Sequence, residues 1–211
     1  HGDACPDDVF CILSHFGRLW GLTAQGRLYW SDLPDHNSWW TASNGNWIDI
    51  FDGDGDEATA LMRAPDGVYV FKDHHVYHVY TRNLDQIQVT ALSLGGSAQR
   101  SLGTPSPRSV TYVRDGIAFF YDANVYILRG LDIQAIGDGV SESLRNVNQA
   151  SSTLGYYSNK GHLWCFDGNT STFIYDFLRR EWIGKYEFQF PGGFVEAQQT
   201  SALPAFYGPG Q

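Results

Sequence analysis

A glycine turn followed by two short β-prone segments occurs four times along this chain. The clearest copy spans residues 66–80, where segments 68–71 and 76–80 flank a polar tip. These segments consist almost entirely of β-branched and aromatic residues, which suit a pleated, half-buried surface. The Asp66-Gly67 pair predicts a tight turn, because glycine reaches positive φ at little steric cost. The corresponding turn glycines are Gly17, Gly67, Gly116 and Gly161, spaced 50, 49 and 45 residues apart.

Each repeat reads as a strand, a glycine turn, a second strand, a short turn, a third strand and a more variable segment. A period of about 40 to 50 residues that holds three or four antiparallel strands is typical of a propeller blade. One such sheet cannot bury both of its faces alone, so neighbouring sheets must stack. We therefore predict an all-β chain: a β-propeller of four to five antiparallel blades, or part of a larger propeller. A two-sheet sandwich is the alternative.

The composition agrees with strands punctuated by turns, because 43% of the residues are hydrophobic, 23 are glycine and one is methionine. We predict a single propeller domain over residues 1–211. Its blade-like repeats are expected at about residues 9–50, 58–92, 108–135 and 152–190, with residues 84–92 as an outer strand. Residues 194–211 are expected to contain a partial strand, from Thr200 to Tyr207, that closes the ring or starts a further blade.

One short helix is expected near residues 141–149. Four apolar residues, Ile136, Val140, Leu144 and Val147, follow one another at spacings of 4, 4 and 3 residues. This spacing places them on one face of a helix. Ser141 is a suitable N-cap and Glu142 lies in the first turn, where an acidic side chain is favourable.

Charge and motifs exclude several function classes. The formal net charge of −9 gives no electrostatic signature for nucleic acid. No apolar run approaches the length of about 18 residues that a membrane span requires. The sequence contains no nucleophile elbow, P-loop, zinc-protease or dinucleotide-binding motif. We therefore predict no catalytic residues and no cofactor, and no carboxylate pair for glycoside cleavage is singled out.

Two clusters invite a metal interpretation. Asp52, Asp54 and Asp56 alternate with glycines, and oxygen ligands at alternate positions suit Ca²⁺. The spacing lacks the twelve-residue pattern of an EF-hand, so a solvated turn is the preferred interpretation. His74 and His78, with His75 between them, would share a zinc ion on a helix. On the predicted strand they stand about 13 Å apart, which is too far for one ion.

The three cysteines, Cys5, Cys11 and Cys165, form no CxxC motif. A Cys5–Cys11 disulfide is one interpretation. Small buried thiols are the preferred one.

Aromatic and cationic residues mark two further segments. Trp39, Trp40 and Trp47 are expected on a polar loop, where they would anchor a protein interface or stack on a glycan. The Arg179-Arg180 pair is interpreted as the turn into an outer strand rather than as a phosphate site.

A series of short motifs resembles the β-propeller structural proteins of tailed bacteriophages, of the head-completion, tail-hub and nozzle type. The resemblance extends over residues 17–183 and lies in the order of the motifs. They are RLYWSD (27–32), a Trp-bearing loop, IDI (48–50), DGDGD (52–56), GVYVFK (67–72), SPRSV (106–110), DGIAFF (115–120), NVY (124–126), TFIYD (172–176) and EW (181–182).

This resemblance implies a non-enzymatic structural subunit of a phage tail, hub or head-to-tail connector. Such a protein would be made in the host cytoplasm and reside in the virion. Its partners would be portal, adaptor or tail subunits, and it would form a homo-oligomer around a symmetric axis. No functional residues are carried over from the family. A carbohydrate-binding propeller is the alternative function, and a glycoside hydrolase is a third.

Overall fold

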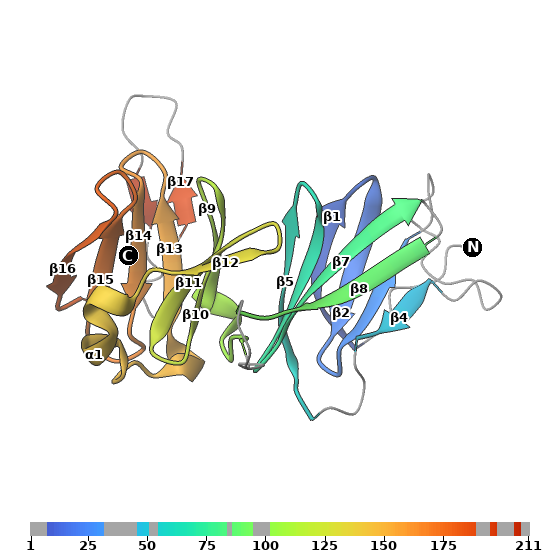
Figure 1. Cartoon of the computed structure of the whole chain (residues 1–211), viewed down its shortest axis with the longest axis horizontal. Coiled ribbons are helices and arrows are strands. Elements are labelled where there is room, and N and C mark those ends of the chain that lie inside the picture. The colour runs from blue at the N-terminus through green and yellow to red at the C-terminus, as the bar shows by residue number, and fades with distance from the viewer. Residues whose placement is uncertain are drawn as a thin grey trace. The chain divides into compact units, whose positions relative to one another are not determined.

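The computed structural model describes residues 8–31, 46–50, 55–83, 86–94, 102–188, 195–197 and 205–207. Within these residues the chain is mostly β, with four four-stranded antiparallel sheets and one short α-helix. In each of the four sheets the strands follow one another in chain order, as in a simple meander (Figure 1). The expected all-β character is confirmed.

The chain divides into two compact units, residues 1–103 and 104–211. The first unit holds two sheets, and β5 lies beside β1. Their facing sides bury Leu22 and Leu28 of the first sheet against Val68, Val70 and Val79 of the second. The strands are β1 (Val9–His15), β2 (Arg18–Thr23), β3 (Arg27–Trp30), β4 (Trp47–Asp49), β5 (Ala58–Ala64), β6 (Gly67–Lys72), β7 (Val76–Asn83) and β8 (Gln86–Leu92).

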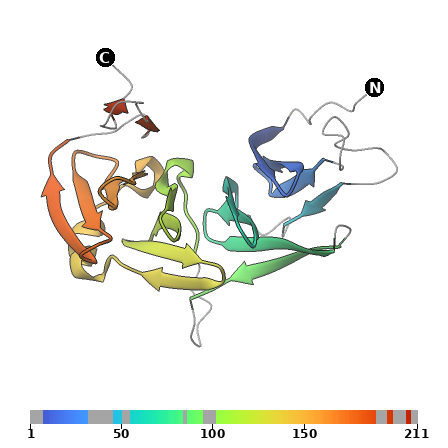
Figure 2. The same ribbon diagram turned by 90° about the horizontal axis from the view of Figure 1, so that it is seen from above.

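The second unit repeats this arrangement, with β13 beside β9 (Figure 2). Its core joins Ala118 and Ile127 of one sheet to Leu163 and Phe173 of the other. The strands are β9 (Val110–Val113), β10 (Gly116–Tyr121), β11 (Asn124–Arg129), β12 (Asp132–Ala135), β13 (Thr153–Tyr157), β14 (His162–Phe166), β15 (Thr172–Asp176) and β16 (Glu181–Tyr186). A two-stranded sheet of β17 (Val195–Ala197) and β18 (Ala205–Tyr207) follows, and β17 lies beside β13.

The outer-strand prediction for residues 84–92 is confirmed over β8, Gln86–Leu92, and residues 84–85 lie outside the described residues. The tail differs from the prediction of one opening strand at Thr200 to Tyr207. Of that segment the structure describes residues 205–207, which form β18 and pair with the preceding β17.

The repeated glycines are required for two different reasons. Gly17 and Gly161 have φ of 70° and 66°, a conformation that costs residues with a Cβ. Gly67 does not have positive φ and opens β6, so the explanation predicted for it is wrong. A Cβ at Gly67 would lie 2.5 Å from the carbonyl oxygen of Val79 on β7. Glycine is needed there because the neighbouring backbone approaches closely.

The predicted helix is shorter than expected. Helix α1 spans Ser141–Leu144, between 3-10 turns at Asp138–Val140 and Gln149–Ser151. Val140 occupies the N-cap position, and Ser141 is the first helical residue, so the predicted cap is wrong. Leu144 and Val147 are nevertheless buried in the core. The apolar spacing therefore correctly indicated which side chains pack into the core. The segment that carries them is a series of short turns and not one continuous helix.

Candidate functional site

The one described member of the calcium cluster, Asp56, has a structural role. Its carboxylate accepts a hydrogen bond from the backbone N–H of His74 at 2.9 Å and lies 2.7 Å from Nδ1 of His75. These contacts tie the segment before β5 to the turn between β6 and β7. Asp52 and Asp54 lie outside the described residues. Over the part of the chain that the structure describes, no three His, Cys, Asp or Glu side chains are grouped to hold a metal.

The three histidines are placed as the strand interpretation predicts. His74 and His75 lie in the turn after β6, and His78 lies on β7 with 5% of its surface exposed. The His78 ring stacks on Tyr69 and Tyr80, with centroids 4.7 and 5.1 Å apart. His78 therefore packs between neighbouring rings of the sheet.

Of the three tryptophan candidates, Trp39 and Trp40 lie outside the described residues. Trp47 is the first residue of edge strand β4, so its predicted loop position is wrong. The Arg27 guanidinium lies 4.2 Å from the centroid of the Trp47 ring. Arg27 also makes two hydrogen bonds to Asp49, at 2.6 and 3.0 Å.

Trp47 belongs to an apolar face of the first sheet. The strand register aligns Ile12, Gly21, Tyr29 and Trp47 in one row across β1 to β4. Ile12 and Trp47 are 54% and 42% exposed, and Phe10 on β1 is 49% exposed. The opposite face packs into the core of the unit. We call Phe10, Ile12 and Trp47 the exposed apolar face.

The two described cysteines, Cys11 and Cys165, are free thiols. Cys165 is fully buried, and this burial raises its pKa to about 12. Burial also raises the pKa of the half-buried Cys11, against the effect of a backbone hydrogen bond from Leu61. Cys5 lies outside the described residues. The prediction of a buried thiol is confirmed for Cys165, whereas Cys11 is a thiol that is only half-buried.

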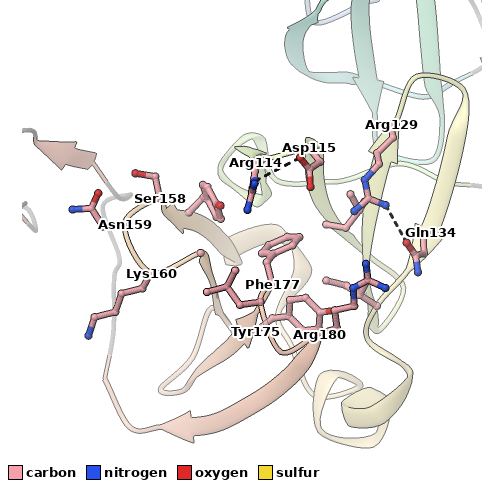
Figure 3. A pocket seen from close by; sticks show the side chains of 15 residues that line it. Arg114, Asp115, Arg129, Gln134, Ser158, Asn159, Lys160, Tyr175, Phe177 and Arg180 are labelled. Atoms are coloured by element: carbon pink, nitrogen blue, oxygen red, sulfur yellow. Dashed lines mark hydrogen bonds and ion pairs between the residues drawn. The ribbon is translucent and has the colours of Figure 1, made fainter.

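A cavity lies in the second unit, between the sheets β9–β12 and β13–β16 (Figure 3). Its volume is about 600 Å³, within the range of small-ligand pockets. Four chain segments reach it, because the turns β9–β10, β11–β12, β13–β14 and β15–β16 all lie at the same end of their meanders. We call it the inter-sheet pocket.

The floor of the inter-sheet pocket is aromatic. The ring of Phe177 makes edge contacts with Tyr156 and Tyr175, with centroids 5.7 and 5.2 Å apart. Tyr175 in turn contacts Trp182 on β16. The Trp182 indole N–H donates to the carbonyl oxygen of Ile136, which follows β12, at 2.7 Å. The floor is therefore fixed by packing within one sheet and by a hydrogen bond to the other.

The rim of the inter-sheet pocket is cationic. Four cations and one carboxylate line it, on a chain whose net charge is −9. These residues are Arg114, Arg129, Lys160, Arg180 and Asp115.

Within the described ranges, Arg114 is the one cation of these four that lies within ion-pair distance of a carboxylate. Arg114 lies 4.0 Å from Asp115, and both side chains are largely exposed. Arg129 donates to the neutral amide oxygen of Gln134 at 3.1 Å. Among the described residues, no carboxylate lies within ion-pair distance of Arg180 or Lys160. Figure 3 places Arg129 and Arg180 on the same side as Tyr175, whereas Lys160 points away.

Arg180 is held in an unfavourable backbone conformation. It ends the turn between β15 and β16 with φ of 57°, in the left-handed region that a non-glycine residue seldom adopts. The Asp176 carboxylate fixes the start of this turn by accepting from the backbone N–H groups of Leu178 and Arg179, at 2.8 and 3.1 Å. The predicted turn at Arg179-Arg180 is confirmed. Strain of this kind is concentrated at functional sites.

The Tyr175 hydroxyl remains protonated beside these cations. Burial raises its pKa, whereas the positive charges of Arg180 and Arg129 act in the opposite direction. A neutral phenol can donate a hydrogen bond to an acceptor in the pocket. The lining contains one carboxylate and neither histidine nor cysteine, so it is equipped to bind an anion rather than to supply an acid–base pair.

The sequence did not single out this pocket, because its residues come from four separate turns. The positions of two cations within the repeats did indicate part of the pocket. Arg114 and Lys160 stand two and one residues before the turn glycines Gly116 and Gly161. Aligned repeats place these two cations at the same end of neighbouring sheets.

No protein-family model and no curated protein matches this chain. It resembles a chain of the S. cerevisiae complex of dbp5 with nup159, gle1, ip6 and adp at 10% identity and a TM-score of 0.47, over 80% of this chain and 44% of that one. A protein of unknown function from Bacteroides caccae matches at 11% identity and a TM-score of 0.44, over 86% and 64% of the two chains. The computationally designed Ika8 protein matches at 10% identity and a TM-score of 0.26, over 90% and 91%.

The chain therefore spans less than two thirds of the first two structures. None of the three is described as a phage protein. Within the described ranges, no helix combines the length and the apolar character needed to cross a membrane.

Proposed function

We propose that this chain is a β-propeller structural subunit that assembles with other proteins of a tailed-phage virion and has no enzymatic role. The proposal combines the ordered motifs of residues 17–183 with the blade-like sheets of both units. As a virion component it would form a homo-oligomer and contact portal, adaptor or tail subunits.

The main support for a propeller is that the first strands of successive sheets lie side by side. β1 lies beside β5 in the first unit, β9 lies beside β13 in the second, and β13 lies beside β17. Propeller blades are arranged in this way, with successive sheets meeting at their first strands around an axis. The β17–β18 pair, which contacts β13 through β17, would then be the inner strands of a further blade.

The exposed apolar face supports a role in assembly. Phe10, Ile12 and Trp47 expose between 42% and 54% of their surfaces on one side of the first sheet. Exposed large apolar side chains gathered on one face of a sheet are typical of interaction sites. A neighbouring subunit would cover this face as adjacent blades cover each other.

The assembly role can be tested by the size of the purified chain. We expect light scattering after gel filtration to give a multiple of the monomer mass, and negative-stain micrographs to contain rings. The double variant Phe10→Ser/Ile12→Ser should shift the population towards monomer. Leu131→Ser is the matched control, because Leu131 is 61% exposed but lies in the turn after β11. A chain that remains monomeric at about 100 μM would contradict the proposal.

The phage setting needs a separate test. Virions produced from the genome that encodes this chain should contain it, as detected by mass spectrometry of purified particles. Gold-labelled antibody should decorate the tail or the head–tail junction. Absence of the chain from particles that contain their portal and tail proteins would remove the virion role.

A further inference from the structure

We infer that the inter-sheet pocket binds an acidic peptide segment of a partner protein, which rests on the proposed assembly role. Carboxylates of the segment would meet Arg114, Arg129 and Arg180, and an apolar side chain would rest on the aromatic floor. The pocket lies in residues 104–211, whereas the exposed apolar face belongs to the other unit, residues 1–103. It is therefore a second binding surface.

The distribution of charge requires a ligand with several negative groups. The guanidinium groups come from three different chain segments, and the lining contains only Asp115 to offset them. Guanidinium groups bind carboxylates through charge-assisted hydrogen bonds of well-defined geometry. A ligand with one carboxylate would pair with one guanidinium and leave the positive charge of the others without a partner. A run of acidic residues would pair with several arginines at once.

The apolar parts of the pocket favour a peptide over an acidic sugar. Leu178 is 73% exposed on the β15–β16 turn that carries Arg180. Together with Phe177 and Tyr156 it provides surface for an aliphatic or aromatic side chain. Recognition of an acidic motif by an arginine cluster beside an apolar anchor is a recurrent mode of peptide binding.

The positive φ of Arg180 provides a way to remove the guanidinium without disturbing the turn. Glycine or asparagine would adopt φ of 57° at position 180 at lower cost. Replacement of Arg180 by glycine should therefore relieve strain and remove the guanidinium in one step. A loss of binding in this variant could then not be attributed to a loss of folding.

The test uses the full chain and a fluorescein-labelled peptide of two glutamates, one leucine and two further glutamates. We expect anisotropy to report saturable binding that weakens as NaCl rises from about 50 to about 500 mM. Arg180→Gly and Arg129→Gln should each weaken binding by roughly tenfold, as expected for loss of a charge-assisted hydrogen bond. Arg180→Gly should melt at the same temperature as the parent chain or higher.

Matched controls define the outcomes. Arg145→Gln removes the same charge from the exposed residue after α1, outside the pocket lining, and should change affinity by less than about twofold. Equal losses in Arg145→Gln and Arg180→Gly would overturn the site, because general charge would explain them. Tighter pocket-dependent binding of trigalacturonate than of the peptide would overturn the ligand class.

The pocket and the assembly role can fail separately. No peptide binding up to about 1 mM, with ring assembly intact, would remove the pocket proposal and leave the assembly role. Pocket-dependent peptide binding by a chain that stays monomeric and is absent from virions would remove the assembly role. In that case the pocket would remain an acidic-peptide site without this partner.

Discussion

The indole N–H of Trp182 donates a hydrogen bond to the carbonyl oxygen of Ile136 at 2.7 Å, across two neighbouring sheets and 46 residues of chain. Trp182 lies on β16, the last strand of its sheet, and Ile136 follows β12, the last strand of the preceding sheet. The bond therefore joins the outer ends of two meanders whose first strands, β9 and β13, are also adjacent. Ile136 lines the inter-sheet pocket, and Trp182 packs against Tyr175 of the same lining, so the bond holds together two residues of the pocket surroundings.

Trp182→Phe tests this connection. The substitution keeps an aromatic ring against Tyr175 but leaves the Ile136 carbonyl without its donor. Loss of one hydrogen bond to a partly buried acceptor should lower the free energy of unfolding by about 1–2 kcal/mol. Urea denaturation followed by circular dichroism measures this change. Tyr186→Phe on the same strand, where the side chain is 45% exposed, should alter stability by less than about 0.5 kcal/mol.

Gly116→Ala tests the close backbone approach at the start of β10. A Cβ at this position would collide with the carbonyl oxygen of Leu128 on β11. The two strands would have to separate, at a cost of about 1–3 kcal/mol. Gly139→Ala is the control in the same unit, because nothing lies within 4 Å of a Cβ there. Equal melting temperatures for the two variants would show that the strands accommodate the methyl group.

Much of the fold could be predicted from the recurrence of one unit. Alternating apolar strands and turn glycines determine a meander locally, so four similar segments predict four similar sheets. The reason for Gly67 could not be read from sequence, because it depends on where β7 runs beside β6. The length of the helix predicted near residues 141–149 was too great for a related reason. Leu144 and Val147 are buried through tertiary packing, and their spacing does not distinguish a helix from successive turns.

The candidate sites were harder to predict. Asp56 stands in an acidic run that suggests a metal, yet its oxygens are used by His74 and His75 on a neighbouring turn. Arg114 and Arg180 are separated by 66 positions in the chain and line the same pocket. Whether two such distant residues line one pocket depends on how the two sheets pack. A local sequence pattern holds no information about that packing.

The Arg27–Asp49 pair predicts a dependence of stability on pH. The hydrogen bonds and charge of Arg27 hold the pKa of Asp49 below its usual value, against the effect of burial. A carboxyl whose pKa is lower in the folded state stabilises the fold fully above its unfolded pKa of about 3.9, and this contribution disappears as pH falls through the folded pKa. Both side chains are partly exposed, so the pair should contribute less than about 1 kcal/mol.

Asp49→Asn should therefore destabilise the chain slightly at pH 7. The difference from the parent chain should shrink as the pH is lowered from about 5 towards 3. About 1 M NaCl should also reduce it, because salt screens exposed charges. Urea midpoints measured across this pH range provide the comparison. A difference that grows on acidification would mean that Asp49 is not the ionised partner of Arg27.

Cys165 should be the slowest of the described thiols to react. It is fully buried between the sheets of the second unit, and burial raises its pKa to about 12. The thiolate is the reactive form, so at about pH 8 Cys165 should react far more slowly in the native chain than in the unfolded chain, where its pKa is about 8.5.

The same pKa difference makes stability depend on pH. Because the folded pKa is the higher one, the stabilisation from the protonated thiol is complete below about pH 8.5 and is lost as the pH rises towards 12. Iodoacetamide labelling followed by peptide mass spectrometry should rank Cys11, which is half-buried, ahead of Cys165 in native protein, and urea should remove the difference. Rapid native labelling of Cys165 would mean that the two sheets of residues 104–211 separate readily, and the inter-sheet pocket would then lack a fixed floor.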